Sequence, residues 1–238
     1  MPVNRFFTHD PLEKGCSATI LGAEHHHLAH VIRIKEGDEV EIANGKGLLA
    51  TAVMKSVGRQ KAEAFIQNVI YEPPPKHKRI IIQAFPKANR LEFILEKCTE
   101  LGMDALWLFP GEKSEKREIK ESQLKRMETI VVSAMKQSGR LYLPQILVKE
   151  HFSKWKDPIP GSLYYGDVHH EAPTLMSVVG EKVDADHFFF IGPESGFSEK
   201  EEKALQEIGA VGVKLNQNIL RTDTAPMVAL SIIGNFYG

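Results

Sequence analysis

The sequence has only two cysteines, Cys16 and Cys98, and no Cys-x-x-Cys pair. This excludes a disulfide framework and a zinc knuckle, and it is typical of proteins from a reducing compartment. No apolar run approaches the roughly 20 residues that are needed to cross a bilayer. The start of the chain, Met1–Phe7, lacks the apolar stretch of a secretory signal. We therefore expect a cytoplasmic protein without a membrane segment.

The chain also lacks an excess of charge of either sign. Its 238 residues include 30 Lys and Arg and 31 Asp and Glu, for a formal net charge of −1, a total that argues against a nucleic-acid partner. The charge is nevertheless uneven, because residues 1–75 carry −1, residues 76–150 carry +5 and residues 151–238 carry −5. A basic middle segment is thus masked by an acidic C-terminal one, which keeps a nucleic-acid partner open.

The clearest domain boundary is the run Pro73–Pro75, which a basic stretch follows. Consecutive prolines fix φ and remove donors, so we predict a stiff linker at residues 73–78 between domains at 1–72 and 79–238. In the first domain we expect strands at 39–42, 49–57 and 62–70, a turn at 44–47 and a short helix at 24–32. This pattern predicts a small β-barrel.

After the linker, strands and helices alternate. We expect strands at 80–82, 105–109, 146–148, 163–165, 188–191 and 211–215, and helices at 91–101, 121–139 and 225–236. Repeated β-α units imply a mostly parallel sheet with helices on both sides. The last helix is apolar nearly all round, so we expect both of its faces to be covered.

One unusual loop, Ile191–Phe197, follows a predicted strand end, where open α/β sheets bind ligands. Gly192 and Gly196 allow its backbone to approach a ligand closely. Ser198 and Glu201 form a capping box that would start a further helix. The loop fits neither the dinucleotide nor the P-loop glycine pattern, so by itself it indicates only a strand-to-helix turn.

A second unusual loop, Leu215–Pro226, joins the last strand to the last helix, with Thr224 as the expected N-cap. Arg221 and Asp223 cannot be buried in this place without partners. For this loop alone, a structural Arg221–Asp223 pair that fixes the helix start and a catalytic role both stay open.

Together, the segments Ile191–Phe197 and Ile219–Ala225 resemble the corresponding loops of the trefoil-knotted SPOUT methyltransferases, and among these the 16S rRNA (uracil-N3)-methyltransferase family. Further blocks that match in order along nearly the whole chain are Arg5–Phe7, His25–Arg33, Gly37–Asp38, Glu96–Gly102, Gln137–Arg140 and Pro144. The resemblance implies an α/β fold, with a SPOUT-type trefoil-knotted domain after a PUA-like RNA-binding β-barrel. The sequence departs from the family pattern where Ser195 and Asn216 replace glycines and Asp223 replaces glutamate.

The resemblance implies an enzyme that uses S-adenosylmethionine to methylate N3 of a specific uridine in 16S rRNA. The cofactor-binding residues that it implies are Gly192, Pro193, Glu194, Gly196, Leu215, Asn218, Ile219, Leu220, Thr224 and Ala225. Arg221 would stabilise the charge on the base and orient it. Asp223 or Glu194 would take up the N3 proton or orient Arg221.

The expected partner is 16S rRNA in the small ribosomal subunit. The RNA contacts implied are Arg5, Arg33, Lys87, Arg90, Ser114, Gln137 and Arg140, for which ordinary solvated surface positions are the alternative. Knotted domains of this type are generally homodimers, and the apolar last helix would suit a dimer interface as well as burial within one subunit.

Two other functions stay open. One is a SPOUT methyltransferase that acts on another RNA such as tRNA, and the other is a non-catalytic RNA-binding ribosome-assembly factor, which Ser195 and Asn216 would favour. His26 and His30 have the i, i+4 spacing of a helical metal pair. Because no carboxylate motif or thiol accompanies them, we expect no metal site.

Overall fold

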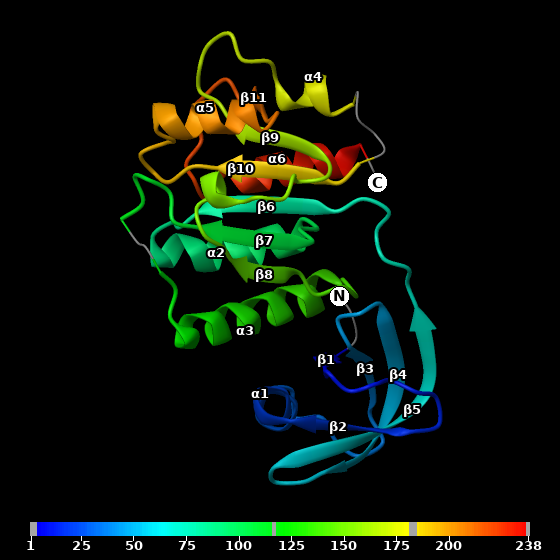
Figure 1. Ribbon diagram of the computed structural model, residues 1–238. Coiled ribbons are helices and arrows are strands. Elements are labelled where there is room, and N and C mark those ends of the chain that lie inside the picture. Colours follow the sequence, from blue (N-terminus) through cyan, green and yellow to red (C-terminus); the bar gives the residue numbers. More distant parts are fainter. Residues whose placement is uncertain (1–3, 116–117, 181–184, 237–238) are drawn as a thin grey trace. The chain divides into compact units, whose positions relative to one another are not determined.

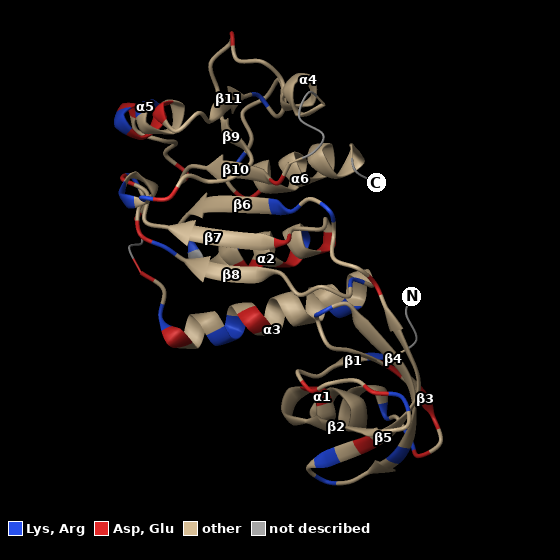
Figure 2. Cartoon of the chain, turned by 45° about the vertical axis from the view of Figure 1, so that its right-hand side comes forward, with Lys and Arg blue, Asp and Glu red and all other residues tan. Residues whose placement is uncertain are grey.

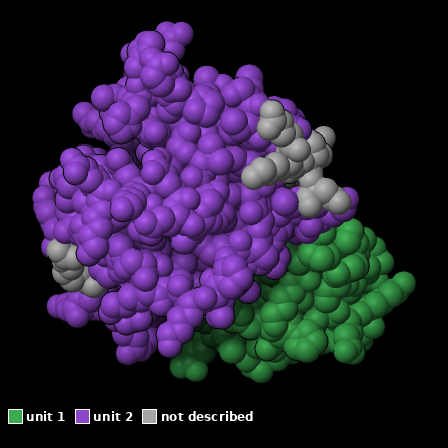
Figure 3. Space-filling view, turned by 45° about the horizontal axis from the view of Figure 1, so that its top comes forward, with its two compact units in different colours: residues 1–74, 132–143 green, residues 75–131, 144–238 purple. Residues whose placement is uncertain are grey.

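The structure, a computed structural model, describes residues 4–115, 118–180 and 185–236. The chain divides into two compact units, one of residues 1–74 and 132–143 and the other of residues 75–131 and 144–238 (Figure 3). The long helix α3 (Glu121–Ser138) contributes its first part to the second unit and its last part to the first.

The first unit is built on a curled five-stranded sheet with the order β1-β3-β4-β5-β2 (Figure 1). Its elements are β1 (Arg5–Phe7), β2 (Ser17–Leu21), α1 (Gly22–His26), the π-helix His27–Ile32, β3 (Glu39–Ala43), β4 (Leu48–Val57) and β5 (Lys61–Tyr71). Only the β1–β3 pair is parallel. The alternating residues of β3, β4 and β5 turn their apolar side chains to one core, as the sequence pattern predicts.

Local chemistry explains two features of this unit. The predicted turn at 44–47 forms because Asn44 Oδ1 accepts hydrogen bonds from the backbone N–H groups of Lys46 and Leu48, at 2.9 and 3.1 Å. The helix expected at 24–32 starts two residues earlier and continues as a π-helix, which ends at Arg33 in the left-handed conformation with φ +62°. Strands β1 and β2 were not expected as strands.

The second unit contains a six-stranded, entirely parallel sheet with the order β11-β9-β10-β6-β7-β8. Its strands are β6 (Arg79–Ala84), β7 (Ala105–Phe109), β8 (Gln145–Val148), β9 (Ser162–Gly166), β10 (His187–Ile191) and β11 (Val211–Val213). Its helices besides α3 are α2 (Ala88–Glu100), the 3-10 turn Phe152–Lys154, α4 (Leu175–Val179), α5 (Glu199–Glu207) and α6 (Ala225–Asn235). Every residue of the central strand β10 is buried, so both faces of the sheet are covered, as expected.

The strands and their helices differ in charge. Lys, Arg, Asp and Glu are almost absent from the strands of the parallel sheet, whereas α3 and α5 carry charges of both signs (Figure 2). The predicted capping box at the start of α5 is present: the side chains of Ser198 and the buried Glu201 each accept a hydrogen bond from the other residue's backbone N–H.

The sheet topologies of the two units confirm the predicted α/β architecture, with a mostly parallel sheet and a separate small β unit.

Two details at the C-terminal end differ from the sequence-based expectation. Strand β11 ends at Val213, so Leu215 belongs to the following loop and not to the strand. Helix α6 packs on β6, β10, α2 and α4, which buries Pro226, Ala229, Leu230 and Ile233. Its other side, including the half-buried Met227, Val228 and Ile232, lines an open hollow, so the described residues fully cover only one face of this apolar helix.

Candidate active site

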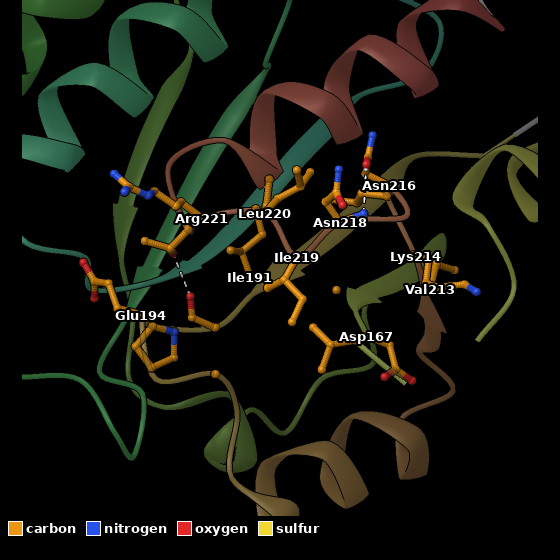
Figure 4. Close-up of a pocket in the computed structure, with 18 of the residues that line it drawn as sticks. Asp167, Ile191, Glu194, Val213, Lys214, Asn216, Asn218, Ile219, Leu220 and Arg221 are labelled. Atoms are coloured by element: carbon orange, nitrogen blue, oxygen red, sulfur yellow. Dashed lines mark hydrogen bonds between the residues drawn. The ribbon is translucent and has the colours of Figure 1, made fainter. Parts of the chain in front are cut away.

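The site lies at the carboxyl ends of β9, β10 and β11, where three loops surround a cavity of about 420 Å³. This is the position at which open parallel sheets bind ligands, and the volume suits a small-molecule ligand. Figure 4 shows Glu194 and Arg221 on one side of the pocket and Asp167 and Lys214 on the other, with Ile219 between them. The predicted cofactor residues that line the pocket are Gly192, Pro193, Glu194, Gly196, Leu215, Asn218, Ile219, Leu220 and Ala225.

A buried polar link joins the two loops that the sequence singles out. Thr222 Oγ1 donates a hydrogen bond to the carbonyl oxygen of Gly192 at 2.9 Å. Gln83, fully buried at the end of β6, donates through Nε2 to Thr222 Oγ1, also at 2.9 Å. Since a buried polar group without a partner is costly, this link fixes the loop after β11 against the loop after β10.

The loop after β10 needs both of its glycines. A Cβ on Gly192 would lie 3.0 Å from the backbone nitrogen of Phe197, closer than side chains normally approach backbone. Gly196 has φ +71°, and its N–H bonds the carbonyl oxygen of Pro193 at 2.9 Å in a tight turn. The loop therefore has a tight backbone conformation that favours glycine at both positions, and both glycines line the cavity.

The loop after β11 presents unpaired backbone groups to the same cavity. Among the described residues, the N–H groups of Leu215, Ile219 and Leu220 donate no hydrogen bond, although each of these residues lines the pocket. The Ile219 side chain, 80% exposed, adds apolar surface at the rim. Backbone donors that lack partners beside apolar surface suit a ligand that carries acceptors and an apolar ring.

Charged side chains gather on one side of the pocket. Arg90 Nε lies 3.6 Å from Glu194 Oε1 and 3.9 Å from Asp223 Oδ2. The exposed Arg221 forms no side-chain hydrogen bond or ion pair with any residue that the structure describes. The structural Arg221–Asp223 pair is therefore absent from the described part of the chain, and neither carboxylate orients Arg221. Both carboxylates face Arg90 instead.

Thr224 immediately precedes α6, as predicted, but its side chain does not cap the helix. It has helical dihedral angles, and its hydroxyl lies 3.5 Å from Asp223 Oδ1. Thr224 is also outside the lining of the pocket, unlike its neighbour Ala225. The structure therefore lacks the N-cap hydrogen bond expected of the Thr224 side chain. A contact between Thr224 and a cofactor stays a prediction.

The predicted RNA contacts are spread over both units. In the first unit, Arg33 and Gln137 are exposed and Arg140 is partly exposed. Arg5 lies in an ion pair with Glu41 at 2.9 Å, and its side chain is only 9% exposed. In this arrangement Arg5 stabilises the β1–β3 pair, and a phosphate contact would require it to leave Glu41.

In the second unit, Lys87 is exposed at the start of α2, and Arg90 belongs to the pocket itself. Ser114 is 5% exposed, with its hydroxyl buried near Gly111. In this arrangement the hydroxyl does not reach the surface, so a contact of Ser114 with RNA would require its loop to move, and it stays a prediction.

The structure adds two residues that the sequence analysis missed. Gln83 is the one polar residue that follows Arg79 in the otherwise apolar strand β6, and this pattern could have marked it. Asp167 directly follows β9, the third strand end of the site, and its Oδ1 bonds His169 Nδ1 at 2.6 Å. This contact raises the pKa of His169, chiefly through the hydrogen bond and then through the charge of Asp167.

No group of three potential metal ligands occurs within the described residues. His26 and His30 lie with their ring centroids 4.9 Å apart, without a third ligand among those residues. In the ranges that the structure covers, no helix has both the length and the apolar character to cross a membrane.

A parallel α/β unit whose last two loops are hydrogen-bonded to each other at a ligand-sized pocket, in a chain that also contains a curled β unit, is the arrangement predicted for a SPOUT-type methyltransferase. A family model described as an RNA methyltransferase domain matches residues 73–234, and one described as an RNA methyltransferase PUA domain matches residues 20–67. The chain belongs to this RNA methyltransferase family, which confirms the resemblance seen in the sequence.

Individual relatives agree in length as well as in sequence. The chain is 29% identical over 247 residues to the ribosomal RNA small subunit methyltransferase E of Bacillus subtilis, covering 97% of this chain and 96% of the relative. The protein of that name from Mycobacterium tuberculosis is 28% identical over 229 residues, covering 93% and 87%. A crystal structure of the Neisseria gonorrhoeae protein of that name, bound to S-adenosyl methionine, has a TM-score of 0.86 at 26% identity and covers 99% of this chain and 98% of its own.

Proposed function

We propose that this protein transfers a methyl group from S-adenosylmethionine to N3 of a specific uridine in 16S ribosomal RNA. The observation that carries the proposal is the pocket at the carboxyl ends of β9, β10 and β11. The Thr222–Gly192 hydrogen bond joins two of the loops that form it. The names of the full-length relatives and the cofactor bound to the Neisseria protein support the same activity. Because the proposed substrate is ribosomal, the protein would act in the cytoplasm.

The residues of the pocket fit the proposed cofactor. Its adenine and carboxylate acceptors match the unpaired N–H groups of Leu215, Ile219 and Leu220, and its rings match the apolar Ile191 and Ile219. The residues that would hold it are Gly192, Pro193, Glu194, Gly196, Leu215, Asn218, Ile219, Leu220, Thr224 and Ala225. When bound, it supplies an electrophilic methyl group on a sulfonium.

The chain's own side chains supply the proton chemistry. A uracil N3 must lose its proton before it becomes a good nucleophile, so a general base and a charge-stabilising group are needed. Glu194 and Asp223 are the candidate bases, since their side chains are partly exposed beside the pocket and are 25% and 20% accessible. Arg221, which has no partner among the described residues, is free to stabilise the negative charge that spreads over the base oxygens.

The rRNA contacts that we propose lie outside the pocket, at Arg5, Arg33 and Lys87, with Gln137 and Arg140 on the last turn of α3 and just beyond it. Arginine, lysine and glutamine suit phosphate oxygens and base edges. In a base pair, the N3–H of uracil donates a hydrogen bond to the partner base. The target uridine must therefore be unpaired or flipped out.

We further propose a homodimer through α6. An apolar hollow of about 320 Å³ is lined by Met227, Val228 and Ile232 of α6, by Phe236 directly after α6 and by Met176 of α4. Met176 and Phe236 are among the large apolar side chains that stay exposed in the single chain. An apolar surface of this kind favours association with a second protein surface.

The substitutions that favoured an assembly factor are compatible with catalysis. Ser195 is exposed and is not among the residues that line the cavity. Asn216 is also exposed, and its Oδ1 accepts a hydrogen bond from the Asn218 N–H at 3.0 Å, which shapes the loop. Asn216 thus takes up the N–H of Asn218, whereas the N–H groups of Leu215, Ile219 and Leu220 keep no partner among the described residues.

The decisive experiment maps methylated uridines in small-subunit rRNA from cells with and without this protein. Loss of one N3-methyluridine in the deletion strain is the expected result, and no change at any uridine would refute the proposal. Calorimetric titration with S-adenosylmethionine distinguishes a methyltransferase from a non-catalytic assembly factor, because the assembly factor would not bind the cofactor. Mapping of tRNA from the same strains tests the alternative substrate.

A further inference from the structure

We propose that Arg90 is a positioning residue that holds Glu194 and Asp223 together at the reacting edge of the pocket, and not an RNA contact. The inference rests on the proposed function, because it assigns a role within the same site. Arg90, Glu194 and Asp223 are called the Arg90 cluster below. The three residues come from three elements, namely the first turn of α2, the loop after β10 and the turn before α6.

Arg90 is the shared partner of the two carboxylates. Its Nε lies 3.6 Å from Glu194 Oε1 and 3.9 Å from Asp223 Oδ2, and no other described cationic side chain pairs with either carboxylate. The backbone N–H of Lys87, which directly precedes α2, also donates to Glu194 Oε1 at 3.3 Å. The start of α2 therefore fixes Glu194 twice, through the main chain and through Arg90.

The two distances have a chemical consequence. Both exceed the 2.7–3.2 Å that is typical of a nitrogen–oxygen hydrogen bond, so they describe ion pairs, and among the described residues Glu194 Oε2 and Asp223 Oδ2 accept no hydrogen bond. Both carboxylates and Arg90 are also partly open to solvent, at 25%, 20% and 25%. Glu194 and Asp223 are thus held in place while they can still accept a proton or a hydrogen bond from a substrate N–H.

The same arrangement argues against a phosphate contact by Arg90. Its single positive charge lies between two negative ones, so the Arg90 cluster carries a net charge of −1 when all three groups are ionised, which repels a phosphate. Without Arg90 the two carboxylates would repel each other and move apart. Arg221 has no such neighbour among the described residues and is the cation that is free for the substrate.

The test compares the variants R90Q and R90K with K97Q as a matched control. Lys97 lies on the same helix and likewise pairs with two carboxylates, Glu96 and Glu100, at 2.8 Å each, but outside the pocket. All four proteins are assayed in full length for methylation of small-subunit rRNA, with kcat and KM for RNA determined separately. The dissociation constant for S-adenosylmethionine is measured by calorimetry.

We expect R90Q to lower kcat by about 100-fold while KM for RNA and the cofactor affinity change less than about threefold. R90K should recover kcat to within about tenfold of wild type, because the ion pairs are not bidentate and a lysine charge can replace them. K97Q should match wild type.

A rise in KM for RNA with unchanged kcat in R90Q would overturn the inference and make Arg90 an RNA contact. Equal activity of R90Q and wild type would overturn it as well. If R90Q fails to fold, R90M decides in the same way, since it keeps the apolar length of the side chain and removes its charge: an RNA contact would raise its KM and a positioning role would lower kcat alone. A wild-type protein that methylates no uridine would instead refute the proposed function, and the inference with it.

Discussion

Thr222 donates its hydroxyl hydrogen to the carbonyl oxygen of Gly192, and this 2.9 Å bond joins the two loops that form the pocket. The hydroxyl in turn accepts a hydrogen bond from the buried amide of Gln83. A strand residue far away in the sequence therefore sets the spacing between both loops. Because the loops present backbone to the ligand, small changes in this spacing alter the whole pocket.

Replacing Thr222 by valine keeps the shape but removes the hydroxyl. We expect T222V to lower the free energy of unfolding by about 1–3 kcal/mol, since the Gln83 amide and the Gly192 carbonyl each lose a buried partner. We also expect affinity for S-adenosylmethionine to fall about tenfold, because the loops are no longer preorganised.

Chemical denaturation and calorimetry measure the two effects of T222V. The matched control is T129V on α3, where an exposed threonine bonds the carbonyl of Lys125 at 3.0 Å within its own helix. T129V should leave the cofactor affinity unchanged. Wild-type affinity in T222V would show that the link has no part in holding the pocket.

Gly196 and Gly209 allow a paired test of backbone conformation. Both have positive φ, +71° and +81°, and an added Cβ would meet no atom within 4 Å at either position. Alanine at either site should therefore destabilise the fold by a similar amount, about 1 kcal/mol, from backbone strain alone. Only G196A should weaken cofactor binding, as measured by calorimetry, because only Gly196 lines the pocket. Equal losses of affinity in both variants would contradict the assignment.

The sequence predicted most of this site because its loops carry local signals. Two glycines, the capping box at Ser198 and the end of an apolar strand pattern are enough to locate the loop after β10. The loop after β11 was found in the same way, although β11 proved two residues shorter than its apolar pattern suggested. The all-parallel sheet follows from the alternation of β and α segments.

The partners of the charged side chains could not be predicted in this way. The pairing of Arg90 with Glu194 and Asp223 joins residues from three distant segments. The pattern of apolar and polar residues along the chain does not indicate whether Arg90 or Arg221 lies beside a carboxylate. The burial of Ser114 was missed for the same reason, because the sequence around a serine in a polar loop does not show which other segments pack over it. Such contacts depend on tertiary packing.

The Asp167–His169 pair predicts a pH effect at the rim of the pocket. Asp167 raises the pKa of His169 above its ordinary value of 6.5. The pair therefore contributes stability that is fully present below about pH 6.5 and is lost as the pH rises through the folded-state pKa. We expect D167N to lower the His169 pKa towards 6.5 in an NMR titration, compared with the wild-type protein under the same conditions. An unchanged His169 pKa in D167N would refute the pairing.

The proposed dimer predicts that a charge in the hollow separates the subunits. Met227 lies on the open face of α6, so M227E would place a carboxylate in an apolar interface. We expect wild type to elute as a dimer and M227E as a folded monomer in size-exclusion chromatography with light scattering. The control I208E changes another exposed apolar residue, at the end of α5, and should stay dimeric. A monomeric wild-type protein at micromolar concentration would contradict the dimer.

Arg221 gives the most direct test of the proposed chemistry. Its side chain has no partner among the described residues, so R221A should unfold at the wild-type temperature, as followed by circular dichroism. If Arg221 stabilises charge on the base, kcat for rRNA methylation should fall by about 100- to 1,000-fold. Cofactor affinity should change much less, because the pocket's backbone donors are untouched. Full methylation by a folded R221A protein would exclude Arg221 from the reaction and leave Arg90 as the pocket's remaining arginine.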